Sequence, residues 1–390
     1  MELYINTNKL ILIYLILFIF STNNNEKLHT YKYKHFIRDC FNLKTYYRKG
    51  IKIETPFVSI CLPAYNMENY IEKVIISILN QSFQNFEIII VNDHSKDKSL
   101  EVIKKLQFKD QRIKLINHSK NSGVYSSRVD SIIASKGKYL MLIDSDDMLI
   151  NPKILEELFN YNLKYNLDLI EFTSISFFEK TNTLTYIDRY YHYHYFSKAI
   201  ISQPYLDDIQ FNPNRIKNDL NIRCRVIWNK IIRKKILIKS LQYIGKEYYN
   251  NFFITAEDTI LNLISFHFAK NYSNINIPGY MYNIREYSMT HDKRNKKKKI
   301  IFCYNHLLYL NKLYEFVKNF NKNRRYLYNE LLDLNKRLIR LNKLTKNSSK
   351  ILQFYNKILN DKYIFQNFRD DDNLLYYEYT SFNYSRSLGF

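Results

Sequence analysis

The chain has 390 residues, enough for one large core or two domains, and its mean hydropathy of -0.39 is typical of a globular protein. Lys and Arg number 59 against 37 Asp and Glu, and the net charge of +22 predicts attraction to polyanions, anionic membrane surfaces or nucleotide phosphates without choosing among them. The four cysteines, at positions 40, 61, 224 and 303, form no Cys-x-x-Cys pair, which argues against a zinc knuckle and a disulfide framework.

Residues 1–22 contain an unbroken apolar run from Leu10 to Phe20 behind Lys9. A helix over this run would be about 16 Å long, shorter than the roughly 30 Å hydrocarbon core of a bilayer. The run therefore fits a signal peptide or a short signal anchor better than a full membrane span, with a buried N-terminal helix as the alternative. We expect a secretory-pathway protein on the ER or Golgi lumen side, either free or associated with the membrane through its N-terminus. A cytoplasmic location is the alternative.

Two further regions lack the pattern of an α/β core. Residues 23–55 are polar, basic and rich in Tyr without periodicity, and we interpret them as a stem or linker. Residues 293–390 are basic, and apolar residues recur near a 3.6-residue period between positions 307 and 341. This period predicts amphipathic helices that pack on the core or on a membrane surface. Residues 56–292 are expected to form the main domain.

Apolar strands alternate with amphipathic helices within residues 56–292. Repetition of strand, helix and strand predicts an α/β fold with a parallel, right-handed, doubly wound sheet. The loops that start at Ala64, Asp93, Asn121 and Asp144 should then share one rim of the sheet, where ligands of such sheets bind. The expected strands are 57–62, 86–91, 113–116, 139–143, 167–172 and 275–282, and the expected helices are 67–79 capped by Asn66, 98–106, 124–134, 152–165 and 259–264.

An acidic motif, Asp144-Ser145-Asp146-Asp147, ends the apolar strand at 139–143. Three carboxylates at the end of a buried strand are costly unless a cation or several hydrogen-bond donors compensate them. A divalent metal ion is the natural compensator, and a solvated acidic turn or a helix cap is the alternative.

An aromatic run, Tyr-Tyr-His-Tyr-His-Tyr at 190–195, lies in an irregular part of the sequence. Its rings could stack on sugars, or its two His could hold a metal, but edge strands under a loop explain it as well. Further on, Glu257 and Asp258 precede a predicted helix, and taken alone they would complement the positive end of its dipole.

Several of these motifs together resemble the family 2 glycosyltransferases of GT-A fold. The first four occur in the order and approximate spacing of that family, and the resemblance is weak between 175 and 220 and absent from the C-terminal helices. The motifs are 58–66, 87–95, 121–123 with Arg128, 137–147, 228–230 and 257–258.

The resemblance implies a nucleotide-sugar site at the rim. The Pro63-Ala64-Tyr65 turn would contact the nucleoside through its backbone, and the Asp93 carboxylate would accept from the N3–H of uracil. Arg128 would supply a fixed cation that holds a phosphate or Asp144. Asp130, two residues further on, places an unexpected negative charge near an anionic ligand.

The same resemblance identifies Asp144-Ser145-Asp146 as a DXD motif. Asp146 would be the direct ligand of Mg²⁺ or Mn²⁺, while Asp144 would bind the ribose or a metal-bound water and Ser145 would line the nucleotide-sugar site. The ion would bridge the diphosphate and neutralise the charge of the leaving group. His291 would be a further candidate ligand from a C-terminal flap, although the motif does not require it.

The acceptor side of the implied site contains Asp258, Glu257 and Trp228. Asp258 would be the general base that takes the proton of an acceptor hydroxyl, which predicts inversion at the anomeric carbon. Glu257 leaves open which of the two acids faces the acceptor. Trp228 would stack on an acceptor or a sugar, or else belong to the core.

These expectations define an inverting, metal-dependent transferase that moves a sugar from a nucleotide-diphosphate sugar, a UDP-sugar, to a glycan, a glycoprotein or a lipid-linked acceptor. A catalytically inactive sugar-nucleotide-binding protein or scaffold of the same fold is the alternative. A basic protein that binds nucleic acid or a membrane surface is a third interpretation, but no nucleic-acid reader motif is present in the sequence and no nucleic-acid partner is expected.

Overall fold

The computed structural model divides the chain into two compact units, residues 1–298 and 299–390. No helix in the described part is long and apolar enough to cross a membrane. The predicted signal or anchor at 1–22, the stem up to residue 54, the aromatic run at 190–195 and His291 lie outside the described residues. The structure describes residues 55–181, 183–186, 200–203, 226–249, 256–285 and 296–320.

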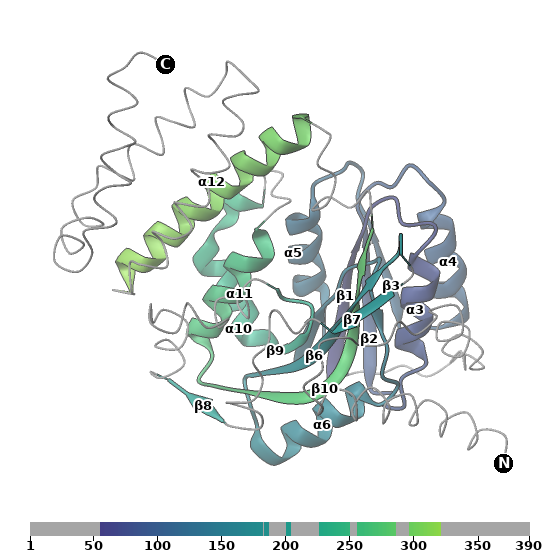
Figure 1. Cartoon of the computed structure of the whole chain (residues 1–390), viewed down its shortest axis with the longest axis horizontal. Coiled ribbons are helices and arrows are strands. Elements are labelled where there is room, and N and C mark those ends of the chain that lie inside the picture. Colours follow the sequence, from purple (N-terminus) through teal and green to yellow (C-terminus); the bar gives the residue numbers. More distant parts are fainter. Residues whose placement is uncertain are drawn as a thin grey trace. The chain divides into compact units, whose positions relative to one another are not determined.

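The first half of the central sheet is parallel, as the sequence predicts (Figure 1). Its strands lie in the order β3, β2, β1, β4, and the pairs β3–β2, β2–β1 and β1–β4 are parallel. Because β1 lies between β2 and β4 and runs parallel to both, the C-terminal ends of these three strands lie at one rim of the sheet. The bounds are β1 (Val58–Ala64), β2 (Phe86–Asn92), β3 (Ile113–Asn117) and β4 (Tyr139–Leu142).

The second half of the sheet is mixed and continues in the order β9, β6, β10, β5. Strand β9 is antiparallel to both β4 and β6, whereas β10 is parallel to β6 and antiparallel to β5. Strands β7 and β8 pair antiparallel with β6 and β10. The bounds are β5 (Met148–Leu149), β6 (Leu169–Phe178), β7 (Thr183–Tyr186), β8 (Ile201–Ser202), β9 (Lys230–Arg233) and β10 (Asn271–Ile284).

Helices cover both faces of this sheet, which confirms the predicted doubly wound α/β class. Helices α3 and α4 lie on one face, and α5, α10 and α11 lie on the other (Figure 1). The bounds are α3 (Ile71–Leu79), α4 (Ser99–Lys109), α5 (Val124–Ala134), α6 (Ile154–Tyr165), α10 (Lys234–Ile244), the short 3-10 helix η3 (Lys246–Tyr248), α11 (Glu257–Phe268) and α12 (Lys296–Asn319).

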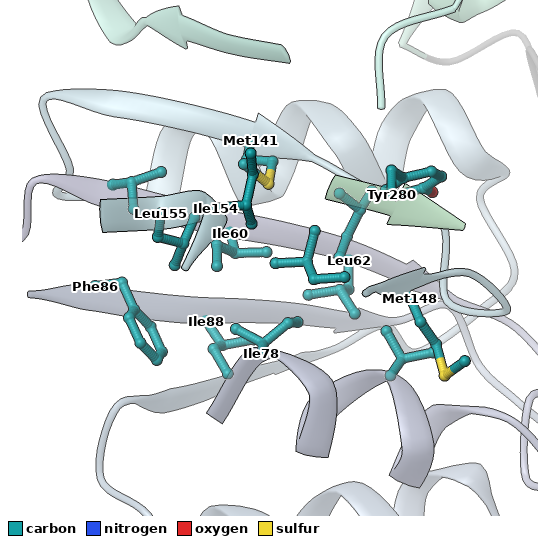
Figure 2. Close-up of a cluster of buried hydrophobic side chains, with 14 of the residues drawn as sticks. Ile60, Leu62, Ile78, Phe86, Ile88, Met141, Met148, Ile154, Leu155 and Tyr280 are labelled. Atoms are coloured by element: carbon teal, nitrogen blue, oxygen red, sulfur yellow. The ribbon is translucent and has the colours of Figure 1, made fainter. Parts of the chain in front are cut away.

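The core under the rim is built from alternate residues of the first strands, which point to the same side of the sheet. Figure 2 shows Ile60 and Leu62 of β1 against Ile88 of β2, Ile78 of α3 and Met148 of β5. All residues of β1 and β2 are buried, so the ends of these strands are held in fixed positions. Further labelled members of the cluster are Phe86, Met141, Ile154, Leu155 and Tyr280.

The predicted helix cap at Asn66 is wrong. Helix α3 begins at Ile71, and Asn66 has a φ of 56°, in the left-handed region that Asn tolerates better than most residues. Its backbone N–H donates to Ser95 Oγ (3.0 Å), and its Oδ1 accepts from the backbone N–H of Lys96 (2.8 Å). Asn66 therefore cross-links the loops after β1 and β2 instead of starting a helix.

Candidate active site

The end of β1 carries the Pro63-Ala64-Tyr65 turn to the rim. Pro63 and Ala64 are buried, whereas the side chain of Tyr65 is 42% exposed. The carbonyl oxygen of Ala64 accepts from the backbone N–H of Asp93 (2.8 Å), so the turn lies directly beside the residue that follows β2. Contact of this turn with a nucleoside stays a prediction.

Asp93 is buried and holds the turn that leads into α5. Its Oδ1 accepts from the backbone N–H of Ser122 (2.8 Å), and its Oδ2 accepts from that of Gly123 (2.8 Å). Gly123 has a φ of 90°, a conformation that glycine adopts without steric cost. The carboxylate therefore joins the loops after β2 and β3, as their shared rim requires.

His118 connects Asp93 to Asp130 on α5. Its Nδ1 lies 2.8 Å from Asp93 Oδ1, and its Nε2 lies 2.9 Å from Asp130 Oδ2. The phenol of Tyr249 also donates to Asp130 Oδ2 (2.9 Å), and burial followed by the nearby carboxylates raises the pKa of Tyr249 to about 12. The negative charge of Asp130 thus faces an imidazole and a phenol.

Arg128 of α5 joins the acidic motif to the start of α11. Its Nη2 donates to Asp144 Oδ1 (2.6 Å), and its Nη1 donates to Glu257 Oε1 (2.5 Å). The guanidinium is buried, and burial alone would lower its pKa, but the charges of Asp144, Glu257 and Asp258 raise the pKa above its ordinary value. Arg128 is therefore a fixed cation at the centre of the rim.

Asp144, Ser145 and Asp146 form the turn after β4. The Asp144 side chain is 30% exposed, whereas Ser145 is buried. Asp146 forms an ion pair with Arg285, and the Arg285 guanidinium lies over the ring of Tyr70, 4.8 Å from its centroid. Asp144 and Asp146, the two acids of the predicted DXD motif, thus each have one carboxylate oxygen paired with an arginine.

Asp147 has a different environment from the two acids before it. It is fully buried, and it accepts from Tyr280 Oη (2.6 Å) and from the backbone N–H of Asn283 (2.7 Å). Both donors belong to β10, so Asp147 attaches the acidic turn to that strand. Burial and the charges of Asp146 and Asp144 raise its pKa well above the ordinary value.

The residues around Asp146 fit a divalent cation. Burial, together with the charge of Asp144, raises the pKa of Asp146 to about 6 although Arg285 acts in the opposite direction, so an added positive charge would be stabilised there. Carboxylate oxygens are the ligands that Mg²⁺ and Mn²⁺ prefer. No group of three or more His, Cys, Asp or Glu forms a metal cage within the described ranges. The described side chains would therefore supply only part of a coordination shell.

Glu257 and Asp258 begin α11 beside Arg128. Glu257 is buried, and burial raises its pKa to about 7 against the effect of Arg128. Asp258 Oδ1 accepts from the backbone N–H of Thr259 (2.7 Å), and burial and then the charge of Asp144 raise its pKa as well. Glu257 thus contacts Arg128 directly, whereas the described hydrogen bonds of Asp258 are to Thr259, and the role of Asp258 as a general base stays a prediction.

Trp228 belongs to the core. Its side chain is 6% exposed and stacks on the rings of Tyr280 (4.6 Å between centroids, 10° between planes) and Tyr282 (5.7 Å, 6°) of β10. This is the core alternative considered for Trp228, and its contact with an acceptor stays a prediction.

Three residues of the site carried no sequence motif: His118, Tyr249 and Arg285. His118 and Tyr249 lie 12 and 119 residues from Asp130 in the chain, and Arg285 lies beyond the last predicted strand. The one available signal was the charge of Asp130, because a carboxylate near an anionic ligand requires a compensating donor.

Comparisons with known proteins match part of the chain to a family. Residues 59–241 match the family model described as Glycosyl transferase family 2. An uncharacterized glycosyltransferase of Haemophilus influenzae is 41% identical over 112 residues, 29% of this chain and 44% of that protein. EpsH of Bacillus subtilis is 30% identical over 248 residues, 63% of this chain and 65% of that protein. The chain therefore spans less than two thirds of the length of these relatives.

Among solved structures, residues 1–349 of TarS from S. aureus in complex with UDP-GlcNAc have a TM-score of 0.47 and 19% sequence identity to this chain, covering 65% of it and 66% of the TarS chain. The family model and the curated relatives carry the assignment. Residues 59–241 of the chain are thus similar to Glycosyl transferase family 2 proteins.

Proposed function

We propose that this chain is an inverting glycosyltransferase that moves a sugar from a UDP-sugar to an acceptor hydroxyl. The observation that carries the proposal is the double contact of Arg128 with Asp144 and Glu257. This contact holds the acidic turn after β4, which would face the donor, next to the acids of α11, which would face the acceptor. Two reactants can be oriented against each other only if their binding groups share one site.

The donor nucleotide would lie along the rim from Asp93 to Asp144. Among the described contacts, Asp93 Oδ2 accepts from Gly123 alone, so it keeps an acceptor position for the N3–H of a uracil ring. The guanidiniums of Arg128 and Arg285, at Asp144 and Asp146, supply positive charge for the diphosphate. A divalent cation held by Asp146 would neutralise the charge that develops on the leaving diphosphate.

Asp258 would take the proton in the reaction. The acceptor oxygen forms a bond to the anomeric carbon while the bond from that carbon to the diphosphate breaks, and the hydroxyl proton passes to the Asp258 carboxylate. Burial raises the pKa of Asp258, which makes its carboxylate a stronger base than an exposed aspartate. Direct displacement predicts inversion, without a covalent enzyme intermediate.

The acceptor class and the location of the reaction rest on the sequence. The apolar run in residues 1–22 supports a location at the lumen side of the secretory pathway, free or anchored. A glycan, a glycoprotein or a lipid-linked acceptor would be met there.

The proposal is tested by UDP release from a panel of UDP-sugars, with the full chain and Mn²⁺. The Asp258→Asn variant should lower kcat by about 10²- to 10⁴-fold, the usual contribution of a general base. The matched control is Glu157→Gln, which makes the same acid-to-amide change at an exposed carboxylate on α6. On the same helix, Phe159 packs on Phe57, which precedes β1. UDP binding without any turnover would support an inactive binding protein, and full activity of Asp258→Asn would remove Asp258 from the mechanism.

A further inference from the structure

His118 occupies an unusual position between two carboxylates. Its side chain is 12% exposed, and its two ring nitrogens lie 2.8 Å from Asp93 Oδ1 and 2.9 Å from Asp130 Oδ2. A carboxylate oxygen accepts and does not donate, so both contacts are hydrogen bonds only if both ring nitrogens carry a proton. His118 thus lies between the two acids, with one ring nitrogen facing each of them.

Asp130 is itself held from the other side. The phenol of Tyr249 donates to Asp130 Oδ2 (2.9 Å) and lies 3.1 Å from its Oδ1, while the carbonyl oxygen of Tyr249 accepts from Ser126 Oγ (2.6 Å). Ser126 and Asp130 both belong to α5. Tyr249 is thus fixed to this helix at its main chain and at its ring, and Asp130 cannot turn away from His118 without losing the phenol.

This arrangement affects the orientation of the Asp93 carboxylate. Its Oδ1 accepts from two donors, His118 Nδ1 and the backbone N–H of Ser122, whereas its Oδ2 accepts from Gly123. A carboxylate with donors on both oxygens has one defined plane, and the remaining acceptor position of Oδ2 then points in one direction. A side-chain donor at Oδ1, in addition to the backbone amide of Ser122, fixes that plane more firmly than the amide does alone.

We infer that His118 is a positioning residue for nucleobase selection, acting through Asp93. This inference rests on the proposed function, because it assumes that a nucleoside diphosphate lies at the rim. Uracil presents an N3–H to a carboxylate, whereas the N3 of cytosine carries no proton and would meet Asp93 Oδ2 as a second acceptor. The orientation of Asp93 would therefore set the preference for UDP over CDP.

A purely structural role for His118 makes a different prediction. If His118 only cross-links β3 to α5, its loss should lower the melting temperature and weaken UDP and CDP equally. If it positions Asp93, the ratio of the two affinities must change, and it must depend on which of the two contacts of His118 is kept.

Two amide variants separate these contacts. His118→Asn keeps a neutral donor near the place of Nδ1, facing Asp93, and loses the donor to Asp130. His118→Gln keeps a donor near the place of Nε2, facing Asp130, and loses the donor to Asp93. Both variants replace the imidazole by a neutral amide, so each is the control of the other.

The test measures the affinities of the full chain for UDP and CDP with Mn²⁺, by calorimetry, together with the melting temperature of each variant. His118→Asn should keep most of the wild-type preference for UDP, and His118→Gln should bind UDP about tenfold more weakly and lose much of that preference. Equal UDP to CDP ratios in both variants would overturn the inference while the proposed function stands. If the wild type binds neither nucleotide, the proposed function fails and the inference fails with it.

Discussion

The guanidinium of Arg128 donates to Glu257 Oε1 across 2.5 Å, although 129 residues separate the two in the chain. The same guanidinium reaches Asp144, so one buried side chain determines how α5, the end of β4 and the start of α11 lie together. Arg128 neutralises two acids that would otherwise be buried or half-buried without a counter-charge. Its removal should therefore affect stability as well as function.

We expect Arg128→Ala to destabilise the first unit by about 3 to 5 kcal/mol, because breaking a buried ion pair leaves the remaining charge uncompensated. Arg128→Lys should cost less, since it keeps the charge but cannot contact both acids with a planar fork. Urea unfolding can be followed by the fluorescence of Trp228, the single tryptophan, which lies in the core of this unit. Wild-type stability of Arg128→Ala would show that the two contacts are weak.

The pKa of Glu257 predicts how stability depends on pH. Burial raises this pKa from 4.5 to about 7, so the folded state holds the proton more tightly than the unfolded state does. The stabilisation is complete below the unfolded value of 4.5 and is lost as the pH rises through about 7. The free energy of unfolding should therefore fall from about pH 5 to about pH 8.

Glu257→Gln isolates the contribution of Glu257 to this fall, because a glutamine keeps an oxygen for Arg128 and has no proton to lose. Asp146, with its pKa raised to about 6 mainly by burial, lowers stability in the same pH range in both proteins. The difference between the two unfolding curves thus reports on Glu257. Identical slopes in the wild type and Glu257→Gln would contradict the assignment.

Gly137 allows the close approach of the loop before β4 to β1. A Cβ at this position would lie 2.5 Å from the backbone nitrogen of Ser59, and the backbone N–H of Gly137 donates to Ser59 Oγ (2.8 Å). Since a backbone atom cannot move aside cheaply, we expect Gly137→Ala to destabilise the first unit by about 1 to 3 kcal/mol.

The melting temperature of Gly137→Ala measures this cost. Ala134→Ser is a useful control, because it also adds one heavy atom, at the last residue of α5, without requiring a new Cβ. A melting temperature of Gly137→Ala equal to that of the wild type would show that the strand moves more easily than the contact distances indicate.

The parallel half of the fold could be predicted because its signals are local. Each of the first four strands is a short apolar run, and each is followed by a helix with a 3.6-residue period, so the order of elements and the shared rim follow from general rules of α/β topology. Asp93 and Asp144 follow β2 and β4 and could be named for that reason, whereas Arg128 lies within α5 and could be named only from the family resemblance.

The mixed half could not be predicted in the same way. Strand β9 (Lys230–Arg233) is short, and its place between β4 and β6 is set by pairing with strands that lie far away in the chain. The burial of Lys230 has no local signal either, because its partner Glu171 lies on β6. The position of His118 has no local signal for the same reason, since it depends on Asp93 and Asp130 meeting in space.

The most direct test of the central claim, a metal-dependent nucleotide site at the rim that contains Asp146, is the melting temperature of the full chain with UDP and Mn²⁺, alone and together. A ligand that binds only the folded state stabilises it by about 2.7 kcal/mol at a hundredfold excess over Kd. We predict a rise with UDP and Mn²⁺ together that persists in Asp258→Asn and is lost in Asp146→Asn. No rise in the wild type, or an equal rise in Asp146→Asn, would contradict the account.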